Sequence, residues 1–410
     1  MKIRLIAPTL LASALLLPVF AHADFNYGVI SYTDIADTFI GSAYTQMGTQ
    51  PAINNAGQVA FSVLARTSIR YLYITPVLGG PMIKVTDGTN GTPSIGNFTL
   101  NNAGTAVFGG YSSAGANAGM TGIFTGNGGA ITTVADSTTL AKPYFTGGTP
   151  RISDTGSVVF TGRDVGSTGQ QIVVQRNGAY SAVATYNGSQ FAYLYDAAIN
   201  NSGQVGFLTG DYSTGNNNGA YVYRANPGGA PVKIGRAVTS TSVDINNSGA
   251  VAFQAAAAIG NGFAPTGLVS SDGLKTTFIS KVGQFLPGTN IKIDGYGDKG
   301  NPINSFGMVA MLASDNSGAN YGIYVGDGVN TQTIIRKGQT LFGKTVRDFT
   351  LGRDSINDSG QVTFSAIFDD NTYAVVVTSG VSAVPEPSTA VLMSLGGLAC
   401  VALRRRRSVA

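Results

Sequence analysis

The chain has 410 residues, of which only 11% are charged, and it contains 56 glycines, one histidine, one cysteine and no tryptophan. The single histidine, cysteine and glutamate are His22, Cys400 and Glu386, so the long middle of the chain has none of these three residue types. Their absence there excludes Ser-His-Asp and Cys-His nucleophile systems, the common zinc and copper sites and any disulfide bond.

Residues 1–23 have the pattern of a cleavable secretory signal peptide. Lys2 and Arg4 provide the positive start, an apolar run follows, and Ala21-His22-Ala23 is an A-x-A cleavage site. We therefore expect export through the Sec machinery and a mature chain that begins at Asp24. The alternative interpretation is an uncleaved transmembrane anchor, which the small-residue site disfavours.

Residues 24–381 contain one nine-residue motif seven times. An aliphatic residue is followed by Asn-x-x-Gly, and then Val and Phe alternate with small or polar residues. Asn and Gly three apart suit the ends of a type I turn, and the alternation predicts a half-buried strand. The third copy departs from the motif at Ser153 and the sixth at Met311. We assign a structural role to the following motif residues: Asn54, Gly57, Phe61, Asn101, Gly104, Phe108, Gly156, Phe160, Asn200, Gly203, Phe207, Asn246, Gly249, Phe253, Asn304, Gly307, Asn357, Gly360 and Phe364.

A second strand pair with an Asn-Gly or Asp-Gly turn follows several copies, which gives about four short strands in about 50 residues. The chain is therefore predicted to be all-β, a β-propeller of seven four-stranded blades. The strands predicted at residues 27–32 and 373–377 would complete the last blade together. A β-solenoid or two stacked β-domains are the alternatives, and the spacing of 46 to 58 residues between motif glycines suits a solenoid poorly.

The tandem Asn-x-x-Gly-x-Val-x-Phe copies resemble an uncharacterised bacterial repeat family with varied surface anchors. The resemblance covers most of residues 50–365. It implies a surface protein and names no ligand.

Paired carboxylates are the remaining route to catalysis, because two Asp can act as acid and base on a glycosidic bond. The candidate pairs are Asp354 with Asp358 and Asp369 with Asp370. Since isolated Asp residues in turns usually cap the backbone, we predict no catalytic residue. An Asp-dependent carbohydrate-active enzyme stays the alternative.

No metal site or cofactor is expected. Calcium is the one ion that the composition leaves open, at Asp315-Asn316-Ser317-Gly318. This segment lacks the twelve-residue loop and the Glu of an EF-hand, so we interpret it as a loop.

Four aromatic residues precede the fourth motif: Tyr186, Phe191, Tyr193 and Tyr195. The last three alternate, so they are expected to share one strand face. If exposed, they would form a platform for stacking a sugar. If buried, they would pack one blade against the next, and this is the interpretation that we favour.

Three elements follow one another in residues 382–410. They are Pro385-Glu386-Pro387, an apolar stretch, and the cluster Arg404, Arg405, Arg406 and Arg407. This tail resembles the PEP-CTERM sorting signal of Gram-negative bacteria. The resemblance implies recognition by an exosortase, transient anchoring in the membrane through the apolar stretch, and delivery to the outer surface or to an exopolysaccharide matrix such as that of a biofilm. Glu386 would be part of this sorting signal.

The two ends also carry the excess positive charge. Without them, the body holds 19 basic and 20 acidic residues, a net charge of −1. Nucleic acid is therefore not expected as a partner. We expect a non-catalytic binding or structural protein of the surface or matrix, whose partners are polysaccharides or other surface proteins.

Overall fold

The computed structural model describes residues 32–34, 44–47, 50–65, 70–76, 81–86, 94–111, 121–136, 149–162, 169–186, 191, 193–211, 219–239, 241–259, 262–287, 289–297, 300–315 and 321–380. All of them belong to one compact unit, Tyr27–Ser382. They form thirty β-strands and no helix, and paired strands run antiparallel. The chain is thus all-β in its described part.

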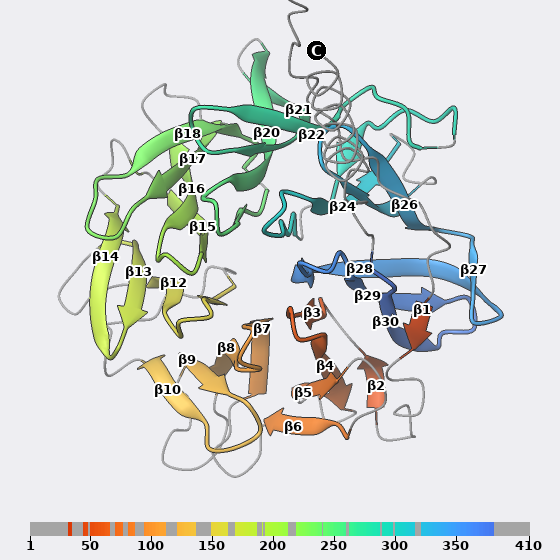
Figure 1. Ribbon diagram of the computed structural model, residues 1–410, viewed down its shortest axis with the longest axis horizontal. Coiled ribbons are helices and arrows are strands. Elements are labelled where there is room, and N and C mark those ends of the chain that lie inside the picture. Colours follow the sequence, from red (N-terminus) through yellow and green to blue (C-terminus); the bar gives the residue numbers. More distant parts are fainter. Residues whose placement is uncertain are drawn as a thin grey trace, which may run out of the picture. The chain divides into compact units, whose positions relative to one another are not determined.

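The strands form sheets that follow one another around a central axis in the order of the sequence (Figure 1). The first sheet consists of β2 (Tyr44–Met47), β4 (Gln58–Ala65), β5 (Arg70–Pro76) and β6 (Ile83–Thr86), with β3 (Ala52–Ile53) also paired to β4. The second consists of β7 (Ser94–Leu100), β8 (Ala106–Tyr111), β9 (Thr121–Gly126) and β10 (Thr132–Asp136). The third consists of β11 (Arg151–Ile152), β12 (Val158–Gly162), β13 (Gln171–Arg176) and β14 (Ala179–Thr185).

Two motif copies share the next sheet, which has eight strands. Its first half is β15 (Tyr193–Ile199), β16 (Val205–Asp211), β17 (Gly219–Ala225) and β18 (Val232–Ala237). Its second half is β19 (Asp244–Ile245), β20 (Val251–Ile259), β21 (Gly262–Ser271) and β22 (Thr276–Lys281). In strand pairing, the two halves are joined by one register pair, Ala237 with Ala255. Each half otherwise has the strand arrangement of one of the other sheets.

The last two sheets complete the circuit. One consists of β23 (Gly295–Tyr296), β24 (Val309–Ser314), β25 (Gly322–Gly326) and β26 (Thr331–Arg336). The other consists of β27 (Thr340–Leu341), β28 (Lys344–Ile356), β29 (Val362–Phe368), β30 (Tyr373–Thr378) and β1 (Tyr32–Asp34).

The N-terminal strand closes the last sheet. Tyr32 of β1 is in register with Thr378 of β30, so the two ends of the body share one sheet. We expected this closure from a strand at residues 27–32, of which residues 27–31 lie outside the described part. The strand that is described runs over Tyr32–Asp34.

All seven motif segments make the turn that their Asn-x-x-Gly spacing predicts. The glycine N–H bonds the carbonyl of the residue three before it, as from Gly57 to Asn54 at 3.0 Å. The seven glycines have φ between 71° and 86°, a region that residues with a side chain rarely adopt. Gly at this position therefore fixes the turn at the start of each second strand.

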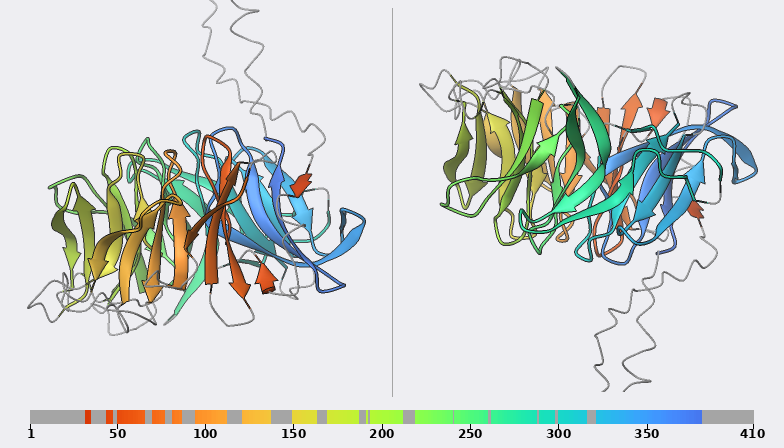
Figure 2. Two further views of the ribbon diagram at one scale, coloured as in Figure 1. Left: turned by 90° about the horizontal axis from the view of Figure 1, so that it is seen from below. Right: turned by 90° about the horizontal axis from the view of Figure 1, so that it is seen from above.

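The hydrophobic core lies between neighbouring sheets, which face one another in the edge-on views of Figure 2. The aromatic residue of the motif points into it: Phe61, Phe108, Phe207 and Phe364 have no exposed surface. Phe108 of β8 lies in one cluster with Leu72 of β5, on the preceding sheet. Val375 of β30 and Phe61 of β4 share another cluster, which joins the last sheet to the first.

Candidate functional site

Two sets of hydrogen bonds tie the motif turns together around the axis. In the first set, the amide of each motif Asn donates to the backbone carbonyl at the same position of the next motif. The six bonds run from Asn54 to Asn101 (2.9 Å), Asn101 to Ser153 (3.2 Å), Asn200 to Asn246 (2.9 Å), Asn246 to Asn304 (3.3 Å), Asn304 to Asn357 (3.1 Å) and Asn357 to Asn54 (3.0 Å). Ser153 has no amide, so the corresponding bond to Asn200 cannot form.

The second set uses the residue after the motif Asn. Here a backbone N–H donates to the side-chain oxygen of the next motif's residue. The bonds run from Asn55 to Asn102 (2.7 Å), Asn102 to Asp154 (2.8 Å), Asp154 to Asn201 (2.8 Å), Asn201 to Asn247 (3.1 Å), Ser305 to Asp358 (2.8 Å) and Asp358 to Asn55 (2.8 Å). Asn247 contacts Ser305 through its side chain instead (3.4 Å). These side chains are occupied in holding neighbouring turns.

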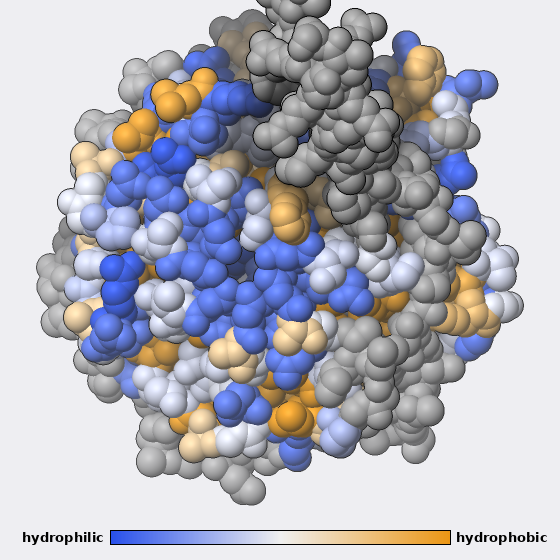
Figure 3. All heavy atoms as spheres, in the orientation of Figure 1, coloured by the Kyte–Doolittle hydropathy of each residue, from blue (hydrophilic) through white to orange (hydrophobic). Residues whose placement is uncertain are grey.

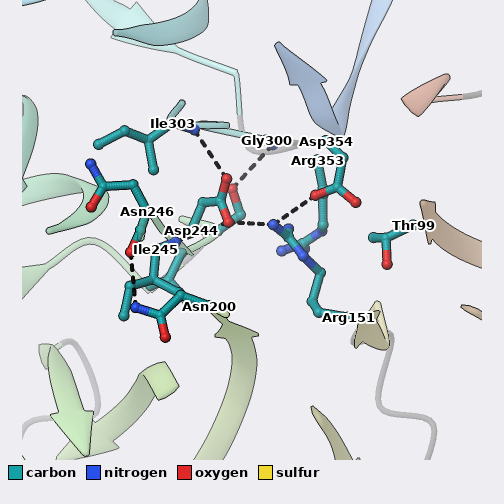
Figure 4. Close-up of polar contacts among 12 residues, drawn as sticks. Thr99, Arg151, Asn200, Asp244, Ile245, Asn246, Gly300, Ile303, Arg353 and Asp354 are labelled. Carbon is teal, nitrogen blue, oxygen red and sulfur yellow. Dashed lines mark hydrogen bonds and ion pairs between the residues drawn. The ribbon is translucent and has the colours of Figure 1, made fainter. Parts of the chain in front are cut away.

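Charged side chains lie at the axis just before the motifs. Arg151 of β11 places Nη2 against Oδ1 of Asp244 from β19 and 2.8 Å from Oδ1 of Asp354 from β28 (Figure 4). Arg353 of β28 makes a second ion pair, with Oδ2 of Asp196 from β15. Because these strands belong to the third, fourth, fifth and seventh motif units, each ion pair joins two motif units that are not adjacent in the sequence.

Backbone amides fix the carboxylates in place. Asp244 accepts from the N–H of Ile245 (2.9 Å) and of Ile303 (3.0 Å). Asp354 accepts from Leu100 (3.2 Å). Asp196 similarly accepts from Val243 at 3.0 Å. Each Asp therefore binds both a guanidinium and at least one backbone amide. These bonds hold the carboxylates and guanidinium groups of the cluster in fixed positions.

Burial and neighbouring charge shift two pKa values here. Burial raises the pKa of Asp244 to about 6, against the opposing effect of Arg151, and the negative charge of Asp354 adds to the rise. Burial alone would lower the pKa of Arg151, but Asp244, Asp354 and Asp196 outweigh it, so this pKa is raised. Arg151 accordingly stays charged, and Asp244 takes up a proton far more readily than an exposed Asp does.

Three buried polar atoms at the axis have no hydrogen-bond partner within the described residues. They are Nη1 of Arg151, Oδ1 of Asp196 and Oγ1 of Thr149. Beside the cluster lies a cavity of about 130 Å³ that is lined by motif residues together with Arg151, Asp244 and Asp354. It has room for several ordered waters, whereas drug-sized ligands occupy about 300–1,000 Å³. Hydrophilic residues also surround the middle of the face in Figure 3.

The two Asp pairs suggested by the sequence have different environments. Asp354 belongs to the axial cluster, while Asp358 accepts from Ser305 and Asn55 in the motif turns. Asp369 and Asp370 lie in the turn between β29 and β30. Asp370 is bound by Thr372 and by Lys344 (3.2 Å), and the hydrogen bonds from Thr372 lower its pKa to about 2. Asp354 and Asp358 both line the axial cavity, but Asp354 is bound by Arg151 and Asp358 by the neighbouring motif turns.

The four aromatic residues divide between the two interpretations, and Phe191 follows the favoured one, core packing. Phe191 is buried and packs at 5.3 Å from the ring of Tyr223, because residue 191 precedes β15 and its side chain enters the core. Tyr193 and Tyr195 do lie together, with ring centroids 5.8 Å apart, and Tyr186 is 44% exposed. Phe191 is therefore unavailable to stack on a ligand.

Sequence reasoning missed Arg151, Asp196, Asp244 and Arg353. The available signal was their place one or three residues before the motif aliphatic residue, where other copies carry uncharged residues or glycine. These positions lie on the innermost strands, so residues that look isolated along the sequence meet at the axis.

Other predictions fall outside the described residues. The signal-cleavage residues Ala21, Ala23 and Asp24 do so, as do the whole tail from Pro385 to Arg407 and residues 316–318 of the suggested calcium loop. Within the described part, no helix is long and apolar enough to cross a membrane. The same part holds no group of three or more His, Cys, Asp or Glu residues arranged to bind a metal.

The tail matches a known family model. Residues 383–407 match the PEP-CTERM protein-sorting motif. This match indicates an exported protein whose tail is recognised by an exosortase. No curated protein sequence matches the chain.

Solved structures with a similar fold include propeller-containing peptidases. The acylaminoacyl peptidase of Pyrococcus horikoshii aligns with a TM-score of 0.53 at 9% identity, over 86% of this chain and 55% of the peptidase. The β-propeller domain of the Trilobed protease from Pyrococcus furiosus gives 0.47 at 13% identity, over 72% and 85% of the two chains. A prolyl endopeptidase gives 0.49 at 12% identity over 82% of this chain, which spans 50% of the endopeptidase. At these identities the likeness concerns the fold alone.

Proposed function

We propose that the body is a seven-bladed propeller, with blades 1 to 7 numbered by their motif copies. The bonds between successive motif turns support this count, since they return from Asn357 of the seventh copy to Asn54 of the first. The pairing of β1 with β30 supports it as well. We treat the eight-stranded sheet as blades 4 and 5, because one register pair joins its halves.

The protein is proposed to be a non-catalytic binding component of the outer surface or extracellular matrix. The signal-like N-terminus would direct export, and the tail would hold the chain in the inner membrane until an exosortase processes it. The match to the sorting motif supports this route. Polysaccharides are the ligands that we propose, with other surface proteins as the second class.

One observation carries the non-catalytic assignment. The three axial carboxylates are each engaged by a guanidinium and a backbone amide, and the cavity beside them is about 130 Å³. Catalytic carboxylates of glycosidases must instead be free to meet a sugar and a water. The axial cluster therefore acts as a polar core that holds blades 3, 4, 5 and 7 together.

The test is saccharide binding and turnover by the full-length chain purified in detergent. We expect a glycan array to show retention of one class of saccharide, and we expect no new reducing ends when that saccharide is incubated with the protein. Retention of no saccharide would overturn the proposed ligand class. Turnover that Asp244→Asn abolishes would overturn the non-catalytic assignment.

A specific observation favours the second candidate, an Asp-dependent carbohydrate-active enzyme. Asp244 and Asp354 contact the same nitrogen of Arg151, which puts their oxygens within roughly 6 Å of each other. The raised pKa of Asp244, about 6, suits a general acid. This candidate requires that Asp244→Asn and Asp354→Asn each remove activity while the Arg224→Gln variant keeps it.

A further inference from the structure

The junction between blades 3 and 4 differs from the other six. Ser153 stands where the other copies have an Asn, so the amide bridge to the Asn200 carbonyl does not form. Ser157 also replaces the Gln found at the same motif position in Gln58, Gln204 and Gln361. This junction thus lacks the bridging Asn, and the short side chain of Ser157 leaves room beside the turn.

Arg176, at the end of β13, occupies the space beside Ser157. Its Nε donates to Ser157 Oγ at 3.3 Å. Its Nη2 lies over the next motif turn, where a methyl group added to Gly203 would come within 2.0 Å of it. The side chain is exposed, so a guanidinium is presented to solvent at the seam between two blades.

A cavity of about 430 Å³ opens at the same seam, larger than the one at the axis. One wall comes from blade 3, including Val174 and Val183, and the other from blade 4, including Val205 and Pro227. Among the described residues that line it, Arg176 is the only charged one. A ligand that complements the cavity therefore has an apolar face and a negative charge, and 430 Å³ lies within the range of small-molecule sites.

Most of the remaining lining residues are apolar or carry amides. Tyr180 of β14 is also a lining residue, but its hydroxyl donates to the carbonyl of Val134 on blade 2, so its ring lies on the other face of the sheet. Asn177 and Asn226 add amide groups to the lining. Apolar walls, amides and one guanidinium together suit a sugar ring that carries a carboxylate.

We propose that the cavity between blades 3 and 4 binds an acidic saccharide, one whose sugars are uronic acids. Arg176 binds the carboxylate, Val205 and Pro227 pack on the apolar C–H face of the sugar, and Asn177 and Asn226 bind hydroxyl groups. This inference rests on the proposed function, because it names the saccharide class and the place where it binds.

Calorimetric titration of the full-length protein in detergent tests the site. The probes are a β-1,4-linked glucuronate tetrasaccharide and cellotetraose, which has the same rings and linkages without carboxylates. We expect the glucuronate to bind more tightly, with a dissociation constant that rises with salt concentration. Arg176→Gln should weaken it roughly tenfold. Tyr180→Ala should leave the affinity unchanged, because the ring of Tyr180 lies on the other face of the sheet, toward blade 2.

Arg224→Gln is the matched control. Arg224 lies at the next junction, where its Nη1 donates to the Gly249 carbonyl at 2.7 Å, and that junction keeps its Asn bridge. We expect this variant to bind the glucuronate as the unaltered protein does. Melting temperatures of all three variants, within a few degrees of the parent, show that each is folded.

Different outcomes test the acidic-saccharide site and the saccharide-binding function separately. Equal binding of both tetrasaccharides, or a loss in Arg224→Gln equal to that in Arg176→Gln, overturns the acidic-saccharide site and leaves a saccharide-binding propeller standing. Glucuronate binding that is unchanged in Arg176→Gln, or a loss in Tyr180→Ala equal to that in Arg176→Gln, overturns this placement of the site. Failure to bind either probe, together with an empty glycan array, overturns the proposed function itself.

Discussion

Asn357 donates from Nδ2 to the backbone carbonyl of Asn54 at 3.0 Å, although 303 residues separate them. The same Asn357 accepts at Oδ1 from the Gln361 N–H at 2.9 Å, so one side chain shapes its own turn and holds the next. Since the bond joins the seventh motif to the first, it closes the ring without a covalent link.

Removal of this closing side chain should destabilise the body. Asn357→Ala leaves the Gln361 N–H without its partner, and the Asn54 carbonyl keeps only its bond from Gly57. The expected loss is about 2–4 kcal/mol, from one unsatisfied group at about 1–3 kcal/mol and one lost hydrogen bond at about 1 kcal/mol. Chemical denaturation measures it. Asn127→Ala is the control, because Asn127 makes a similar local bond in an exposed hairpin turn, to Gly129 at 3.3 Å, and bridges no motifs. Equal losses in both variants would contradict the role of the bridge.

Restoring the missing amide bridge between the third and fourth motifs should stabilise the body. In Ser153→Asn, the new amide can donate to the Asn200 carbonyl while its oxygen accepts from the Ser157 N–H, as Ser153 Oγ does now at 3.2 Å. We expect a gain of about 1 kcal/mol, the net value of one hydrogen bond. Differential scanning calorimetry measures the change in melting temperature. A lower melting temperature than the parent would show that Arg176 needs the space.

Replacement of Arg151 should lower the free energy of unfolding more than replacement of an exposed arginine. Arg151→Met leaves Asp244 and Asp354 buried without their shared cation, and breaking one side of a buried ion pair costs about 3–5 kcal/mol. Arg347→Met is the comparison, since Arg347 contacts Asn371 at an exposed site, and we expect a change of under about 0.5 kcal/mol. Urea denaturation of both variants tests the difference, and similar losses would argue against an axial network.

The free energy of unfolding should fall as the pH rises from about 4 to about 6. The pKa of Asp244 is about 6 in the folded protein and is expected near its ordinary value of 3.8 in the unfolded chain. Between these values the folded state binds more protons, so raising the pH favours unfolding, by about 1–3 kcal/mol in all.

Asp370 does not mask this effect, because its lowered pKa of about 2 acts below pH 4. Denaturation curves at pH 4, 5, 6 and 7 measure the slope, and Asp244→Asn should abolish it. A parent protein whose stability is flat or rises between pH 4 and 6 would contradict the assignment.

Sequence patterns alone predict the turns, the core positions and the sorting motif at the C-terminal end. Asn-x-x-Gly specifies a turn through bonds within five residues, and alternating Val and Phe specify which face of a strand is buried. Such local and periodic signals do not depend on distant residues. The Pro-Glu-Pro, apolar and arginine elements of the tail are contiguous for the same reason.

Only the tertiary structure decided what lies at the axis and at the seam between blades 3 and 4. Arg151, Asp244 and Asp354 are up to 203 residues apart and meet because ring closure brings the innermost strands together. Phe191 entered the core for a similar reason, since its place depends on Phe207 and Tyr223 from later strands. Spacing along the chain predicts neither the axial ion pairs nor the packing of Phe191, because both depend on the relative positions of separate blades.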